Sequence, residues 1–183
     1  MRGFFIRYYN MPSRLSIKIV SGIVLLIYLL LLTKKVVFKQ GGLRYYKHYF
    51  AREYKNYSVS EGWKKANTVP FRTINMYKKG LARNNSNAEY NLLGNFIGFI
   101  PFGILLPLFW PWFRHGIKML LAGFILSLGF ETLQLLTGLG VWDVDDLLLN
   151  TTGTVAGYIL FFLIKTAMSF FEKKPVLQTQ DNF

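Results

Sequence analysis

Residues 16–32 read SIKIVSGIVLLIYLLLL, and no charged residue lies between Ile19 and Thr33. As a helix this run rises about 25 Å, close to the thickness of the hydrocarbon core of a bilayer. Basic residues precede its uncharged core, and TKKVVFKQ follows it without a small-x-small cleavage site. We therefore predict an uncleaved signal-anchor helix rather than a removable signal peptide.

Three further apolar runs are long enough to cross a membrane, and they occupy 91–110, 117–137 and 144–168. The first of these contains Pro101 and Pro107, so we expect a kink near Pro101. With 16–32, the runs predict an all-α, polytopic membrane protein of four transmembrane helices. The remaining segments are a basic N-terminal segment at 1–15, a basic aromatic extramembrane loop at 33–90 and a polar tail at 169–183.

The composition supports a membrane protein and excludes several site types. The net charge of +13 would suit nucleic acid, but a mean hydropathy of +0.26 with 52% hydrophobic residues indicates a membrane protein with basic loops. The absence of cysteine excludes a disulfide framework, a thiolate zinc site, an iron–sulfur cluster and a cysteine nucleophile. His48 and His115 lie far apart, which argues against a histidine-rich metal site.

The distribution of basic residues gives conflicting indications of which side of the membrane the termini lie on. Four spans put both termini on one side, and the loop on the other side carries 13 Lys and Arg residues at 33–90. By count, the loop would be cytoplasmic. The loop is near the length at which the positive-inside rule ceases to apply, and the first helix often dominates. We therefore expect cytoplasmic termini, although Lys34 and Lys35 oppose this choice.

Unusual polar residues should meet at the loop side of the membrane. The second span starts there, the third ends there and the fourth starts there. These stretches carry Asn91, Asn95, Glu131, Gln134, Asp143, Asp145, Asp146 and Asn150. Glu131 lies about two turns inside an apolar helix, and an intramembrane carboxylate is by default a functional candidate. The alternative for Glu131 is a structural hydrogen bond that locks the third helix to its neighbours.

The acids before the fourth span allow two interpretations. Asp143 can cap the helix with Asp146 at its third position, where acids suit the helix dipole. Capping does not explain three acids, so Glu131 and Asp146 are candidates for a catalytic acid–base pair or for oxygen ligands of a divalent cation. Neither role has a strict spacing motif, and the sequence contains no serine elbow, P-loop or H-E-x-x-H.

Two G-x-x-x-G stretches predict close helix packing, at Gly94 and Gly98 and at Gly153 and Gly157.

The loop at 33–90 is rich in both basic and aromatic residues. This composition predicts that the loop lies on anionic lipid or binds a headgroup phosphate, and Arg72 is a candidate phosphate-binding residue. Tethering to the membrane disfavours nucleic acid as a partner.

Four stretches in this order resemble the VanZ-like family over about residues 67–160: NTVPFRTI at 67–74, NLLGNFIGFIPFGILLP at 91–107, LSLGFETLQ at 126–134 and VWDVDDLLLNTTGTVAG at 141–157. The family consists of small polytopic bacterial membrane proteins and takes its name from a member that confers low-level teicoplanin resistance. Its pattern falls on Pro70, Phe71, Asn95, Pro101, Gly103, Glu131, Gln134, Asp143, Asp146, Asn150 and Gly153.

The resemblance implies a plasma-membrane protein of the bacterial cell envelope that reduces susceptibility to a lipoglycopeptide antibiotic. It would do so by altering or shielding a lipid-linked surface target. One alternative is a hydrolase or transferase that acts on a lipid or a lipid-linked headgroup. Another is a small transporter, which the gathering of polar residues at one face disfavours. Expected partners are anionic lipids, a lipid-linked cell-wall precursor or the lipoglycopeptide; no cofactor is evident beyond a divalent cation.

Overall fold

The computed structural model describes residues 14–39, 41–82 and 86–172, without the side chains of residues 14, 81, 86–91, 171 and 172. Four long helices run through this part of the chain: α1 (Arg14–Val36), α5 (Ser86–Phe109), α6 (Gly116–Thr137) and α7 (Val144–Glu172). By length and composition each of them could cross a membrane. The predicted all-α protein with four apolar spans is therefore confirmed.

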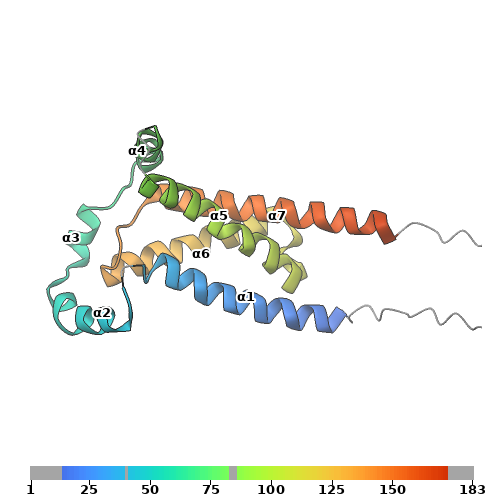
Figure 1. The fold of residues 1–183 in the computed structure, drawn as a ribbon, viewed down its shortest axis with the longest axis horizontal. Helices are drawn as coiled ribbons and strands as arrows, with labels where there is room; N and C mark the ends of the chain where they lie inside the picture. Colours follow the sequence, from blue (N-terminus) through green and yellow to red (C-terminus); the bar gives the residue numbers. More distant parts are fainter. Residues whose placement is uncertain (1–13, 40, 83–85, 173–183) are drawn as a thin grey trace, which may run out of the picture.

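Within the predicted 33–90 loop, residues 41–82 form a cap of short helices at one end of the bundle (Figure 1). This cap contains α2 (Leu43–His48), the π-helical turn η1 (Tyr49–Glu53), the 3-10 turn η2 (Tyr54–Asn56), α3 (Val59–Lys64) and α4 (Arg72–Leu81). At the other end, the 3-10 turn η3 (Pro111–Arg114) joins α5 to α6, near the start of α1.

Glycines allow α5 and α7 to approach closely. A Cβ atom on Gly153 or Gly157 would collide with a backbone carbonyl oxygen of α5, and one on Gly103 would collide with a carbonyl of α7. Gly94 and Gly98 instead face α1, where an added Cβ would lie 3.6 and 3.8 Å from the nearest side-chain atoms, an ordinary contact distance. The tight helix pair of this bundle is therefore α5 with α7.

Pro101 and Pro107 lie inside α5, and the helix continues through both of them. A proline removes a backbone donor and disturbs the hydrogen bonds of the preceding turn. The hydroxyl of Tyr28 on α1 donates to the carbonyl of Gly98 at 2.6 Å, three residues before Pro101. This contact holds α1 against α5 where the proline weakens the helix.

A buried apolar cluster supports the cap end of the bundle. Its members come from α1, the cap, α5, α6 and the α6–α7 loop: Leu32, Val37, Tyr49, Phe99, Phe130 and Leu139. Phe130 precedes Glu131 directly in α6, so this cluster adjoins the level of the polar residues at this end of the bundle.

Candidate functional site

The polar residues of α5, α6 and α7 gather beneath the cap. Glu131, Gln134 and Asn150 are each 1% exposed, and Asp145 is fully buried. Asn95 and Asp146 come into contact from α5 and α7, since the amide of Asn95 donates to Asp146 Oδ1 at 2.6 Å. The side chain of Asn91 lies outside the described residues, and Arg72 is exposed at the start of α4.

Asp143 fastens the cap to the start of α7. Its Oδ1 accepts the amide hydrogen of Asp145 at 2.8 Å, which is a helix-capping bond. The same oxygen accepts the side-chain amide of Asn67 at 2.8 Å, and Oδ2 accepts the hydroxyl of Thr73 at 2.6 Å. The backbone of Asn67 also pairs with residues 142 and 144, at 2.8 and 2.9 Å. Asp143 therefore acts as a structural anchor.

Asp145 holds the start of α4. Its carboxylate accepts the backbone N–H groups of Phe71, Thr73 and Ile74, the last two at 2.7 and 3.1 Å. Phe71 precedes α4 in a left-handed conformation with φ 65°, which is uncommon for a residue with a bulky side chain. A buried carboxylate on these unpaired donors stabilises both the turn and the helix N-terminus.

Glu131 keeps one carboxylate oxygen without a partner. Its Oε2 accepts the backbone N–H of Asp143 at 2.8 Å. Its Oε1 is buried and makes no hydrogen bond within the part of the chain that the structure describes. The negative charge of Asp146 acts on Glu131, and the positive charge of Lys39 acts on both. The charges of Glu131 and Asp146 therefore influence each other, and the charge of Lys39 opposes that effect on both.

A phenol from the cap adjoins this pair. Burial, and then the negative charges of Asp146 and Asp143, raise the pKa of Tyr77 on α4 above its usual value. The phenol therefore keeps its proton and remains a hydrogen-bond donor near Asp146.

Two further amides of the cluster connect helices. Gln134 donates to the carbonyl of Val36, at the end of α1, at 2.9 Å. Asn150 donates to the hydroxyl of Ser127 on α6 at 2.9 Å, while its own Oδ1 is buried without a partner among the described residues. Unpartnered buried polar atoms are rare in folded proteins, and among the described residues Glu131 Oε1 lies on α6 while Asn150 Oδ1 and the Thr151 hydroxyl lie on α7.

Within residues 14–39, 41–82 and 86–172, no group of three or more His, Cys, Asp or Glu side chains could hold a metal ion. Asp143 and Asp145 already use their oxygens on the cap. Among the described acids at this end, Glu131 and Asp146 bond instead to the N–H of Asp143 and to the amide of Asn95.

Several residues that build this end were not identified from the sequence. Asn67 and Thr73 lie in the NTVPFRTI stretch without having been assigned a role, and Lys39 belongs to no motif. The hydroxyls of Tyr49, Tyr54 and Tyr57 donate to the carbonyls of the last turn of α6, the first two at 2.9 and 3.1 Å. Those carbonyls have no partner inside the helix, so the loop tyrosines complete its C-terminus. Burial raises the pKa of Tyr49 and Tyr57, which keeps both as donors.

The comparison with protein families extends the resemblance carried by the four stretches. A family model described as VanZ/LLP1 matches residues 24–165, which include all four long helices in large part and the whole cap. No match was found among curated proteins or among solved structures. Because the match covers well over half of the sequence, this membrane protein belongs to the VanZ/LLP1 family.

Proposed function

We propose that the protein lowers susceptibility to teicoplanin-type lipoglycopeptides from the bacterial plasma membrane, by altering or shielding a lipid-linked surface target. In this proposal the termini are cytoplasmic and the cap faces outward. The observation that carries it is the buried Oε1 of Glu131, an acceptor without a partner among the described residues, beside Asp146 at the cap end of the bundle.

The chemistry of this end suits a polar headgroup at the membrane surface. The carboxylates of Glu131 and Asp146 accept hydrogen bonds, which hydroxyl and amide groups of a sugar–peptide headgroup would donate. The positive charge of Lys39 acts at the same place and would attract a phosphate or pyrophosphate. A lipid-linked cell-wall precursor combines these groups on one molecule.

A second candidate is a hydrolase or transferase that acts on a lipid-linked headgroup. Two interacting carboxylates in a buried site are a residue pair that general acid–base catalysis uses, one as acid and one as base. The contact between Asp146 and Asn95 would orient the base. A transporter is less well supported, because carriers place their polar groups near the midplane of the membrane.

Teicoplanin susceptibility in a sensitive Gram-positive host tests the proposal. The host would carry empty vector, the wild-type chain, Glu131→Gln or the control Glu61→Gln, at matched membrane levels. Glu61 is an exposed acid of α3 that pairs with Lys64 on the surface, so its loss should leave protection unchanged. We expect protection from the wild type and from Glu61→Gln, and none from Glu131→Gln.

Two results would overturn the proposal. Absence of protection by the wild type would remove the function, and full protection by Glu131→Gln would remove the role of the buried acid. The enzyme alternative is tested separately, by incubating the purified chain with lipid extract of the host and analysing it by mass spectrometry, with and without added divalent cation. A product that disappears in both Glu131→Gln and Asp146→Asn would favour catalysis.

A further inference from the structure

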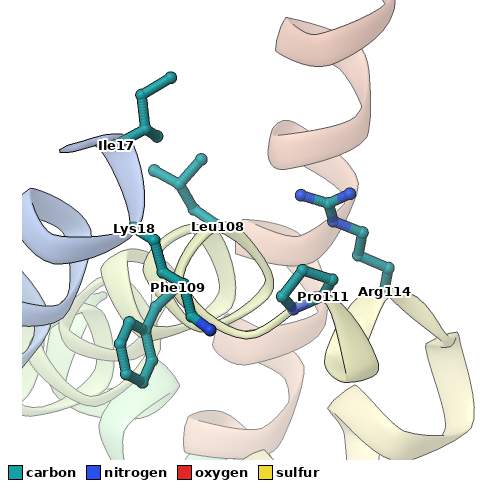
Figure 2. A pocket seen from close by; sticks show the side chains of 6 residues that line it. All are labelled: Ile17, Lys18, Leu108, Phe109, Pro111 and Arg114. Atoms are coloured by element: carbon teal, nitrogen blue, oxygen red, sulfur yellow. The ribbon is translucent and has the colours of Figure 1, made fainter. Parts of the chain in front are cut away.

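A second feature lies at the opposite end of the bundle, away from the cap. A cavity of about 520 Å³ opens between the start of α1, the end of α5 and η3 (Figure 2). Its walls are formed by Ile17, Lys18, Leu108, Phe109, Pro111 and Arg114. Figure 2 shows the Lys18 side chain beside Phe109 and the Arg114 side chain on the other side of Pro111, one from α1 and the other from η3.

An apolar groove continues from this cavity along α1 and α5. The groove has a volume of about 280 Å³ and shares Ile17 and Leu108 with the cavity. Its other lining residues are Ser16, Val20, Ser21, Val24 and Leu105. Because α1 and α5 cross the membrane, the groove leads from the basic cavity towards the apolar interior of the bilayer.

The charges at this end have one sign. Among the residues whose side chains the structure describes, every Asp and Glu lies between Glu53 and Asp146, in the cap or at the cap ends of α6 and α7. Arg114 is held by the protein: its Nε donates to the carbonyl of Pro107 at 3.2 Å, and its guanidinium lies 5.8 Å from the ring centre of Phe161. The cavity thus presents two cations without a described acid to neutralise them.

The surrounding aromatic residues mark a lipid–water boundary. Trp110 and Trp112 flank Pro111 and are 54% and 53% exposed. The ammonium of Lys118 lies 4.0 Å from the ring centre of Trp112. Exposed tryptophans beside basic residues are typical of the headgroup level of a membrane. The cavity therefore lies at headgroup depth and the groove at acyl-chain depth.

We propose that the cavity and groove bind one anionic glycerophospholipid. Its phosphate lies between Lys18 and Arg114, and one acyl chain fills the groove along Val20 and Val24. This assignment rests on charge and shape together: cations at one end of the space match the phosphate, and the apolar walls match the chain. It is independent of the function proposed for Glu131 and Asp146, because the two sites lie at opposite ends of the bundle.

Native mass spectrometry of the full chain, released from nanodiscs of phosphatidylglycerol and phosphatidylcholine, tests the lipid site. We expect the wild type to retain one phosphatidylglycerol in preference to phosphatidylcholine. Removing two cations in Lys18→Gln/Arg114→Gln should weaken this retention roughly 25-fold, at roughly five-fold per basic side chain near the membrane surface. The control Lys118→Gln/Lys165→Gln removes the same charge from the same end outside the cavity and should retain the lipid.

A groove variant keeps the test valid if loss of Arg114 disturbs folding. Val20→Trp fills the exposed groove without changing any charge, and it should reduce retention of phosphatidylglycerol as strongly as the double substitution. Equal losses in the cavity and control double variants would overturn the site in favour of diffuse basic attraction. Equal retention of both lipids would overturn the phosphate assignment. A dimer that Val20→Trp abolishes would assign the groove to a second copy of the chain instead.

Discussion

The substitution Asp145→Asn should open the cap without unfolding the bundle. The carboxylate of Asp145 is fully buried and accepts three backbone N–H groups at the start of α4. Asparagine has almost the same shape but only one acceptor oxygen. It could keep the bonds to Thr73 and Ile74, while its own amide group would face the N–H of Phe71.

The loss can be estimated from these contacts. A hydrogen bond to a charged group contributes about 1.5–3 kcal/mol, and an anion at a helix N-terminus contributes about 0.3–1 kcal/mol. Asp145→Asn removes one such bond and the charge from the others. We therefore expect the free energy of local opening of α4 to fall by about 2–4 kcal/mol, which corresponds to roughly 30- to 900-fold faster amide exchange if α4 opens independently of the bundle.

Hydrogen exchange of the full chain in nanodiscs, followed by mass spectrometry, measures this opening. Exchange should rise in peptides covering residues 67–81 and stay constant in peptides of α6. The control Glu61→Gln removes an exposed acid from the same cap and should change neither region. Unchanged exchange of α4 in Asp145→Asn would refute the view that this acid holds the cap.

Three further substitutions test the packing and the capping contacts, each by thermal unfolding in detergent. Gly153→Ala should destabilise the protein by about 1–3 kcal/mol, because its Cβ would meet the α5 backbone. The control Gly129→Ala has open space around it and should be neutral or stabilising; equal effects would contradict the close approach of α5 and α7. Tyr57→Phe should cost about 1 kcal/mol by leaving an α6 carbonyl unpaired, and an unchanged melting temperature would contradict that capping. Phe71→Gly should stabilise by about 0.5–1 kcal/mol, because glycine adopts the positive φ without steric strain, and a lower melting temperature would show that the exposed ring is needed.

The four spans were predictable because each of them contains a long, mainly apolar run. The short helices of the cap were not. Helices of six residues such as α2 and α3 are too short to form alone, and they depend on contacts made elsewhere in the structure. Tyr49 and Tyr57 contact α6 residues that lie 88 and 78 positions further along the chain, respectively. A local sequence pattern cannot predict contacts between residues so far apart.

For the candidate site, the sequence predicted where its residues lie better than what each of them does. Chain topology was enough to suggest that Asn95, Glu131 and Asp146 would lie at one end of the bundle. The capping pattern pointed to Asp143, whose carboxylate does cap α7, but neither it nor the topology revealed the role of Asp145. The partners of Asp145 are backbone N–H groups, which every residue except proline carries, so its structural role has no signature in the sequence.

This division of roles decides how loss of function should be interpreted. Asp143 and Asp145 anchor the start of α4 and the residues before it, and the backbone N–H of Asp143 donates to Glu131, so substituting either acid would disturb the site even if neither touches a ligand. Loss of protection in such variants is therefore no evidence for chemistry. Glu131→Gln removes one proton-accepting oxygen while keeping the acceptor that faces the N–H of Asp143. A loss of protection with unchanged exchange of residues 67–81 would identify the unpartnered oxygen itself as the functional group.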